Sequence, residues 1–243
     1  MVQQLVSDSY TDYPGMYPDS DGQPMADNTK QFRWIVTIKE NLERLFSDAE
    51  VFVAGDLLWY PVEGSPKIRQ APDVMVAFDR PKGDRGSYQQ WLEANVSPQV
   101  VFEILSPGNR PGEMLRKLNF YQRYGVEEYY IYDPDSNEIN GFQRSNKTLQ
   151  LISEMDGWVS PRLKIRFCPL ENTLEIYRPD GKKFLTFVEL GEQISALDEQ
   201  VAELGEQVSA LSEQLSEEKT QRQKEQQRIQ ALEAKLKEAG IDL

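Results

Sequence analysis

Residues 99–134 read QVVFEILSPGNRPGEMLRKLNFYQRYGVEEYYIYDP, and this stretch decides the fold that the sequence predicts. Residues 99–105 form a short apolar run bounded by turn residues, which is typical of a buried strand. Apolar residues then recur at helical spacing over 112–124, and the pattern stops at Gly125, a residue type that often ends helices. Residues 128–132 form a second buried run. The stretch therefore predicts a strand, a helix and another strand in succession.

The segments before this stretch predict a helix and two more strands. Asn28 or Thr29 is a suitable N-cap for a helix that ends at about Phe46. Its apolar residues share one face: Phe32, Ile35, Ile38, Leu42 and Leu45. Strands are expected at 51–60 and 72–78, so the whole order is α-β-β-β-α-β.

The segments after it predict short strands in antiparallel hairpins that extend the sheet. They are expected at 138–144, 148–153, 163–167, 174–177 and 183–187. We therefore expect an α/β (α+β) fold, in which an αβββαβ core carries extra antiparallel strands.

The last part of the chain follows a heptad pattern. Apolar residues recur in alternating steps of four and three: Leu190, Ile194, Leu197, Val201, Leu204, Val208, Leu211 and Leu215. Residues 191–204 and 205–218 form an internal repeat. The seam positions become polar at Glu218, Arg222 and Glu225, and apolar residues return at Ile229, Leu232 and Leu236.

This pattern predicts a homodimer through a coiled coil over 190–236. β-branched residues at one seam position and leucine at the other favour a parallel two-stranded coil. The alternatives are a single solvated helix or a helix that folds back on the body. Residues 7–28 are rich in Asp, Ser, Pro and Gly and lack any period. We therefore expect an extended arm over 1–28, a globular domain over 29–188 and the coiled coil over 189–243.

The sequence contains no histidine and a single cysteine, Cys168. The absence of histidine excludes Ser-His and Cys-His nucleophiles, a histidine general base and imidazole metal sites. One cysteine allows neither a disulfide within the chain nor a cysteine-cluster metal site, and it indicates a reducing compartment. Any catalysis must therefore rely on carboxylates, lysines, hydroxyls or a hard metal ion.

The net charge of the 243-residue chain is −13, which argues against a broad electrostatic attraction to nucleic acid. From Glu189 onward, however, the chain holds 6 basic and 13 acidic residues, or −7, which leaves −6 for residues 1–188. The N-terminal sequence lacks the basic start and apolar run of a signal peptide, and no stretch approaches the ~18 apolar residues of a membrane span. We therefore expect a cytoplasmic protein with no membrane partner.

Two acidic residues interrupt apolar runs in the predicted strands. Asp73 precedes the run at 74–78, and Glu103 lies between apolar pairs. Burying a carboxylate there is costly unless a cation or hydrogen-bond donors compensate it. If the strands are neighbours, the two carboxylates converge at one end of the sheet in an arrangement that suits Mg²⁺. The alternative for either acid alone is a strand-end carboxylate that accepts hydrogen bonds from turn N–H groups.

Lys117 lies on or beside the stripe of the second helix that should face the sheet, together with Met114 and Tyr121. Its ammonium group is suited to stabilise charge on a scissile phosphate or to orient an attacking water. The alternative is a lysine whose charged end extends into solvent.

Other residues are candidates for substrate contact. Arg110 and Arg116 lie near the start of the same helix, although Arg116 is explained equally well as a solvated flank residue. The polar loop 79–98 offers three more basic residues: Arg80, Lys82 and Arg85. Asp56 has two readings of equal weight, a bulge or turn residue and a metal ligand. A buried aromatic strand is the better explanation of Tyr129, Tyr130 and Tyr132.

The ordered set of motifs resembles a known family. The α-β-β-β-α-β order, PDV at 72–74, FEILSP at 102–107, GEMLRKLNFY at 112–121 and GVEEYYIYDP at 125–134 resemble the Uma-two family of restriction endonucleases. That family belongs to the PD-(D/E)XK nuclease superfamily and is abundant in cyanobacteria. The resemblance covers about residues 30–180, and its specificity lies in the ordered set rather than in any single motif.

The resemblance implies roles for individual residues. Asp73 matches the metal-binding aspartate of the PD element, and Glu103 matches the acidic residue of the following strand. Strict E-x-K spacing would place a lysine at Leu105, so the chain departs from the superfamily pattern there. Lys117 matches a lysine that has moved to the next helix in families of this type.

The resemblance also implies a restriction-endonuclease-like core and Mg²⁺ or Mn²⁺ held by Asp73, Glu103 and the Ile104 carbonyl. Superfamily members often add a glutamate from the first helix, and Glu40 and Glu43 are both available. The implied function is a metal-dependent DNA endonuclease that hydrolyses phosphodiester bonds and self-associates through its coiled coil. The alternative is a catalytically inactive nuclease fold that serves as a binding or oligomerisation module.

Overall fold

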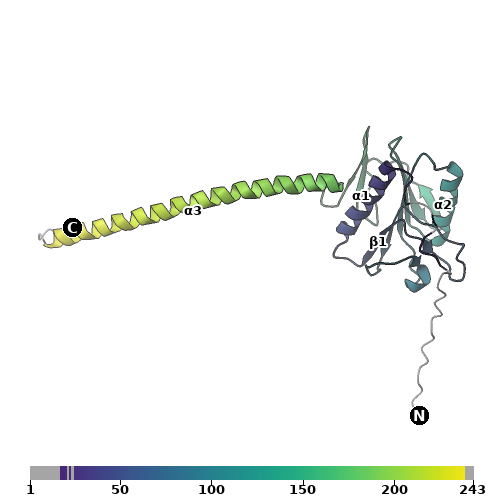
Figure 1. Ribbon diagram of the computed structural model, residues 1–243, viewed down its shortest axis with the longest axis horizontal. Coiled ribbons are helices and arrows are strands. Elements are labelled where there is room, and N and C mark those ends of the chain that lie inside the picture. Colours follow the sequence, from purple (N-terminus) through teal and green to yellow (C-terminus); the bar gives the residue numbers. More distant parts are fainter. Residues whose placement is uncertain (1–16, 21, 23–24, 239–243) are drawn as a thin grey trace, which may run out of the picture. The chain divides into compact units, whose positions relative to one another are not determined.

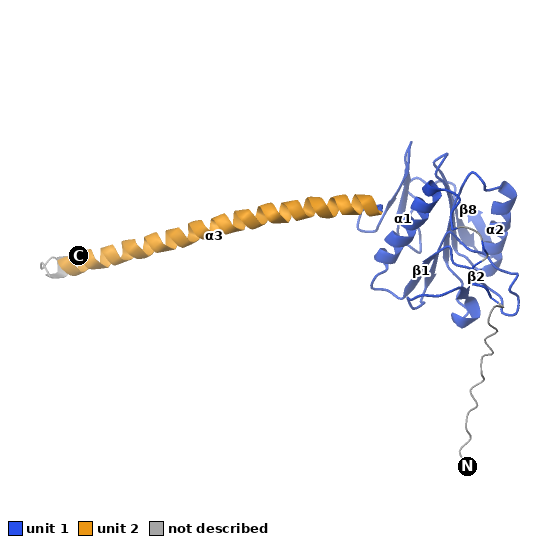
Figure 2. Cartoon of the chain, in the orientation of Figure 1, with its two compact units in different colours: residues 1–186 blue, residues 187–243 orange. Residues whose placement is uncertain are grey.

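The computed structural model of the chain describes residues 17–20, 22 and 25–238. The chain divides into two compact units, residues 1–186 and 187–243 (Figure 2). Most of the predicted N-terminal arm, 1–28, lies outside the described residues. Unit 1 is a mixed α/β domain, and unit 2 contains one long helix, α3 (Phe187–Glu238). No helix in the described part of the chain has the length and hydropathy needed to cross a membrane.

A six-stranded mixed sheet forms the centre of unit 1, in the order β1-β3-β5-β6-β7-β8. Its strands are β1 (Val51–Gly55), β3 (Val74–Phe78), β5 (Val100–Ile104), β6 (Glu128–Asp133), β7 (Glu138–Ser145) and β8 (Thr148–Leu151). Within this sheet only β5 and β6 are parallel. Parallel neighbours need a crossover, which helix α2 (Pro111–Tyr124) supplies.

The two faces of the sheet bury two different cores. Helix α1 (Thr29–Leu45) packs Ile35, Ile38 and Leu42 against one face. Helix α2 covers the other face, where Tyr121 packs among the side chains of alternate strand residues such as Met75. Figure 1 shows α1 and α2 on different sides of the strands. The predicted fold class and the α-β-β-β-α-β order are therefore confirmed, and the alternation of side chains along each strand explains the two cores.

The strand expected at 51–60 is interrupted. Asp56 has a φ of 47°, in the left-handed region, and ends β1. The chain then forms β2 (Trp59–Tyr60), which pairs in parallel with β4 (Tyr88–Gln89) in a separate two-stranded sheet. A short 3₁₀ helix, η1 (Gln90–Leu92), follows β4. The prediction of one strand was wrong because an apolar run does not reveal a turn in its middle.

The later strands extend the sheet only in part. β7 and β8 do so as predicted, but β9 (Arg166–Pro169) and β10 (Leu174–Tyr177) form a sheet of their own. Their Phe167 packs on Tyr130, with ring centroids 4.7 Å apart, and so covers the α1 face beyond the reach of α1. The strand predicted at 183–187 is absent, because Lys183 forms only an isolated bridge and α3 begins at Phe187.

Helix α1 also differs from its predicted apolar face in one respect. Asn28 caps the helix by accepting a hydrogen bond from the Gln31 N–H. Phe32, predicted to face the core, is 48% exposed, whereas Gln31 is buried. The helix is therefore rotated so that its first turn presents an amide, rather than a ring, to the sheet.

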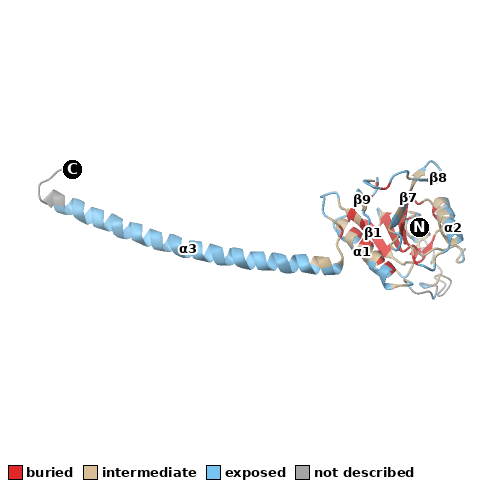
Figure 3. Ribbon diagram, turned by 90° about the horizontal axis from the view of Figure 1, so that it is seen from above, coloured by how far each residue is buried: buried red, intermediate tan, exposed pale blue. Residues whose placement is uncertain are grey.

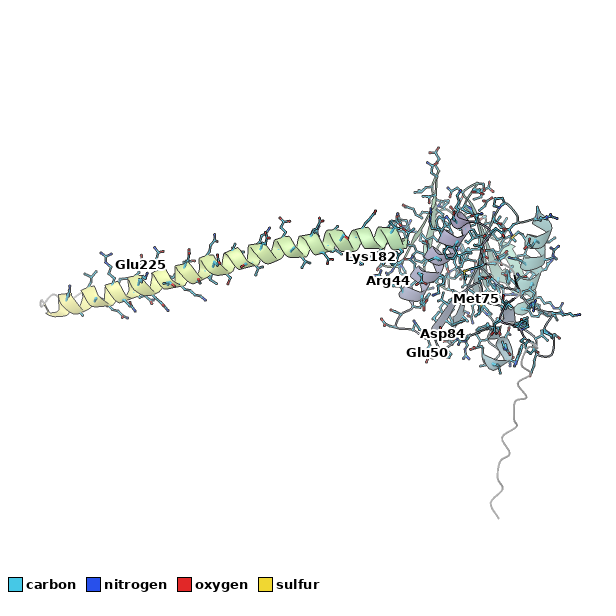
Figure 4. The ribbon with its side chains drawn as sticks, in the orientation of Figure 1. Arg44, Glu50, Met75, Asp84, Lys182 and Glu225 are labelled. Carbon is cyan, nitrogen blue, oxygen red and sulfur yellow. The ribbon has the colours of Figure 1, made fainter. Side chains whose placement is uncertain are left out.

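Helix α3 exposes its apolar seam. Seven seam residues are 51–66% exposed: Ile194, Leu197, Val201, Leu204, Val208, Leu211 and Leu215. Figure 3 shows α3 as exposed almost throughout, in contrast to the buried strands of unit 1. Side chains, Glu225 among them, project from the helix into solvent (Figure 4). As a single copy, this helix leaves its seven seam residues exposed to water.

Candidate active site

Three acidic residues occupy one row across adjacent strands. The register pairs Gly55 with Val74 and Val74 with Phe102. The next positions along the same registers are Asp56, Asp73 and Glu103, and the Asp56 N–H donates to the Asp73 carbonyl at 3.2 Å. Side chains alternate along a strand, so Asp73 and Glu103 face α2, as Met75 and Val101 do. The structure thus brings together two acids that are 30 residues apart in sequence.

The Asp73 carboxylate is almost fully buried, with 8% of the residue exposed. Its Oδ2 accepts a hydrogen bond from the Ile104 N–H at 2.6 Å. Burial raises the pKa of Asp73 well above its ordinary value, and the negative charge of Glu103 raises it further. Lys117 and the Ile104 N–H act in the opposite direction without cancelling the shift.

Glu103 is 1% exposed, and both of its oxygens are engaged from α2. Lys117 Nζ donates to Oε2 at 2.7 Å, and the Tyr121 hydroxyl donates to Oε1. Burial raises the pKa of Glu103, although Lys117 and Tyr121 both favour its charged form. For Lys117, burial alone lowers the pKa, but the charges of Glu103 and Asp73 outweigh it and the net pKa is raised.

Both partners of Glu103 come from helix α2, because Lys117 and Tyr121 are one turn apart on the same face of the helix. The helix has Pro111 in its first turn and ends at Gly125, whose φ of 96° suits a glycine C-cap. The apolar period of the helix places Tyr121 on the inward stripe but does not indicate its contact with Glu103. The i, i+4 spacing from Lys117 was the available signal.

Gln31 is a second residue at the site that the sequence pattern did not predict. Its Nε2 donates to the Ile104 carbonyl at 2.8 Å, and its Oε1 accepts from the Asp27 N–H. Both backbone polar groups of Ile104 are thus bonded, its carbonyl to Gln31 and its N–H to Asp73. A buried polar residue in the first turn of an amphipathic helix was the only signal in the sequence.

Glu40 and Glu43, the two candidates from the first helix, lie elsewhere. Both are ion-paired with Lys39, and their side chains are substantially exposed. Along the axis of α1, Glu40 and Glu43 lie about 14 and 18 Å beyond Gln31. Neither takes part in the hydrogen bonds around Asp73 and Glu103. The residue that α1 directs toward the acidic row is therefore Gln31.

The basic residues predicted to contact substrate are not gathered around the carboxylates. Lys82 donates to the Phe46 and Ser47 carbonyls at the end of α1, and the Arg85 guanidinium pairs with Glu93 and lies over the Phe52 ring. Both residues border a groove of about 310 Å³ that follows β1. The partly buried Arg80 directs its Nε inward, where no residue in the described part accepts it.

Arg110 and Arg116 lie nearer to the site in sequence. Arg110 is the N-cap residue of α2 and makes no side-chain capping bond. Both residues are exposed. Within the described ranges, no ion pair holds either guanidinium. Both guanidinium groups are thus open to an incoming phosphate.

The oxygen atoms at this end of the sheet fit a hard divalent cation. Two buried carboxylates face one lysine, and burial raises the pKa of both, so a further positive charge would offset the cost of ionising them. The described residues contain no cluster of three or more His, Cys, Asp or Glu side chains arranged to bind a metal. The ligand set would be Asp73, Glu103, the Ile104 carbonyl and water, which is a common way to hold Mg²⁺.

Comparisons with known proteins identify the family of the chain. The model of the Uma2 family, described as "Putative restriction endonuclease", matches residues 20–166, more than half of the chain, and this range includes Asp73, Glu103 and Lys117. The resemblance seen in the sequence motifs is thereby confirmed.

No curated protein matches the chain. A solved structure titled as a putative nuclease belonging to DUF820 from Anabaena variabilis is 15% identical, with a TM-score of 0.41, and covers 57% of this chain and 74% of its own. On the strength of the family match over residues 20–166, the chain belongs to the Uma2 family of putative restriction endonucleases.

Proposed function

We propose that the protein is a metal-dependent endonuclease that hydrolyses phosphodiester bonds in DNA. The observation that carries the proposal is the buried contact between Lys117 and Glu103, 2.7 Å long, directly beside Asp73 on the neighbouring strand. A buried pair of carboxylates with one lysine, and without histidine, suits metal-assisted hydrolysis. The cytoplasm, where DNA is accessible, is the compartment of the proposed activity.

Each residue has a stated role in this proposal. Asp73 and Glu103 would hold Mg²⁺ or Mn²⁺ together with the Ile104 carbonyl, and the bound ion would supply Lewis acidity and a more acidic water. Lys117 places positive charge where negative charge develops on the phosphate. Arg110 and Arg116 would contact neighbouring phosphates of the backbone.

We further propose that two copies pair through the seam over 190–236. Support comes from seven exposed apolar residues of α3, those from Ile194 to Leu215, and from their unbroken heptad spacing. A dimer would carry two sites, which would suit cutting both strands of a duplex. Leu204→Glu should convert a dimer into a monomer in light scattering, while Glu203→Gln, outside the seam, should not. Wild-type protein that is already monomeric at micromolar concentration would refute the pairing.

The activity is tested on supercoiled plasmid with Mg²⁺, Mn²⁺ or EDTA. The wild-type protein should produce nicked and linear forms only with a metal ion. Asp73→Asn and Lys117→Met should abolish the products, whereas Glu40→Gln, an exposed acid on α1, should leave them unchanged. Cutting that persists in EDTA or in Asp73→Asn would refute the assignment. Folded protein that cuts nothing and binds no metal would instead favour the inactive binding module.

A further inference from the structure

The hydroxyl of Tyr129 is a buried polar group near the site that has no hydrogen-bond partner in the described part of the chain. Tyr129 lies in β6 and is 0% exposed. Its Oη is fully buried and has no hydrogen-bond partner among residues 17–20, 22 and 25–238. Other buried tyrosines nearby are satisfied: Tyr121 donates to Glu103, and Tyr130 donates to Glu128.

The position of Tyr129 directs its side chain to the face that carries the acidic row. The residue pairs with Val101 in the parallel register, two positions before Glu103 on β5. Residues 101 and 103 share a face, so Tyr129 points to the side covered by α2. Its ring lies 4.9 Å from that of Tyr121, the residue that holds Glu103.

The electrostatic environment of Tyr129 agrees with this placement. Burial raises the pKa of its hydroxyl, and the charges of Glu103 and then Asp73 raise it further. The hydroxyl therefore lies within the field of both carboxylates and keeps its proton. Neither carboxylate accepts a hydrogen bond from this hydroxyl, and neither does the Tyr121 hydroxyl, while the neighbouring Phe142 ring has no oxygen or nitrogen acceptor.

A buried hydroxyl without a partner is unfavourable, and ordered water commonly satisfies such groups. Phenylalanine would fill the same space among the rings without this cost. Mg²⁺ usually keeps several of its waters when proteins bind it, and hydrogen bonds to those ligands strengthen binding. A water between the two carboxylates and Tyr129 would satisfy the hydroxyl and belong to the site.

We propose that Tyr129 is a positioning residue whose hydroxyl donates a hydrogen bond to a water held at the Asp73 and Glu103 site. The proposal rests on the proposed function, because the water belongs to the coordination shell of the ion. It differs from a purely structural role in a measurable way. A structural hydroxyl without a partner can be removed without loss of metal affinity, whereas a hydroxyl that orients a bound water cannot.

The test compares Tyr129→Phe with the matched control Tyr130→Phe in the full-length protein. Tyr130 is the next residue on the same strand and is equally buried. It faces the opposite side of the sheet, where its hydroxyl donates a hydrogen bond to Glu128. Mn²⁺ affinity is measured by calorimetry, and the urea midpoint is measured in EDTA. Tyr129→Phe should keep or raise the midpoint and weaken Mn²⁺ binding about 10-fold. Tyr130→Phe should lower the midpoint and leave Mn²⁺ affinity unchanged.

The outcomes separate this inference from the proposed function. If the wild type binds Mn²⁺ and Tyr129→Phe binds it equally well, the role of Tyr129 is refuted while the metal site stands. A clear drop of the midpoint of Tyr129→Phe in EDTA would also refute it, because the hydroxyl would then have a partner within the protein. If the wild type itself binds no Mn²⁺, both proposals fail.

Discussion

Two buried glutamates on adjacent parallel strands differ in the charge of the groups around them. Glu103 on β5 and Glu128 on β6 are each 1% exposed, and burial raises the pKa of both. Among the described residues, Glu128 accepts hydrogen bonds from three neutral groups, namely the Tyr130 and Ser160 hydroxyls and the Arg162 backbone N–H. Glu103 has the ammonium of Lys117 as a partner and Asp73 as an acidic neighbour.

The comparison shows that burial of a carboxylate does not by itself indicate a catalytic site. The bonds to Glu128 hold the turn at 160–163 against the sheet, since Ser160 Oγ also accepts from the Leu163 N–H. This glutamate is satisfied by the fold. At the other end of the two strands, two acids compete for one lysine, and that excess of negative charge suits a cation.

The largest expected effect comes from replacing the two glutamates separately. Glu103→Gln should lower metal-dependent cleavage at least 100-fold, or about 2.7 kcal/mol, because the site loses a ligand charge. Glutamine still offers an oxygen to Lys117 and an NH₂ group from which the Tyr121 hydroxyl can accept, and Asp73 remains an anionic neighbour of the ammonium, so the urea midpoint should change less than in Glu128→Gln. Cleavage rates and urea unfolding are measured on the same preparations. Full activity in Glu103→Gln would contradict a catalytic role for Glu103 and leave it no different in function from Glu128.

Glu128→Gln should show the reverse pattern. An amide NH₂ would face the Tyr130 and Ser160 hydroxyls, whose oxygens already accept from Trp158 Nε1 and the Leu163 N–H. The two hydroxyl protons would lose their acceptor, at a cost of about 1–3 kcal/mol in the free energy of unfolding. Cleavage per folded molecule should be unchanged, because Glu128 faces the α1 side of the sheet. The same two assays apply, and a loss of cleavage without a loss of stability would contradict the structural role.

A smaller effect is expected in the pH dependence of Asp73→Asn. The pKa of Asp73 is raised in the folded state, mainly by burial, so the folded protein binds its proton more tightly than the unfolded chain. The free energy of unfolding of metal-free wild type should therefore fall as pH rises above about 3.9, by up to ~1.4 kcal/mol per unit, until the raised pKa is passed. Asp73→Asn should lack this component, so its advantage over wild type in EDTA should grow with pH. Parallel curves from pH 4 to 8 would show that the pKa is not raised.

The smallest effect is expected in the metal affinity of Lys117→Met. Removing the ammonium leaves Asp73 and Glu103 without their compensating charge, so calorimetry should show Mn²⁺ binding a few-fold more tightly. Cleavage should be abolished in the same variant, as in the plasmid assay, because the positive charge toward the phosphate is lost. Weaker Mn²⁺ binding would mean that Lys117 organises the ligands rather than competing with the ion.

The sequence was informative about elements and much less so about contacts. The apolar periods of α1, β3, β5, α2 and β6 were sufficient to predict the core order, because each reflects the face that its own element buries. They could not show that Phe32 turns outward and Gln31 inward. That choice depends on the Ile104 carbonyl, which lies 73 residues further along the chain and needs a donor.

The same limit applies at the acidic row. Asp73, Glu103 and Lys117 were identifiable as polar residues in apolar patterns. Glu40 and Glu43 were equally good candidates for the glutamate of the first helix, and the sequence did not choose between them. Only the position of α1 on the sheet separates them from the site, with Lys39 as their partner. Tyr129 illustrates the point further, since an aromatic strand residue gives no sign of whether its hydroxyl is satisfied.

The sequence alone determined the exclusion of histidine and disulfide chemistry, the order of the core elements and the heptad pattern of the C-terminal helix. These features follow from composition and from the spacing of apolar residues, which repeats every 2, 3.5 or 3.6 residues. Such a repeat can be recognised within one segment of the chain. The tertiary structure decided the row of Asp56, Asp73 and Glu103 and the Tyr121 contact. Strand register and the approach of a helix to a sheet depend on segments far apart in the chain, and no local period encodes them.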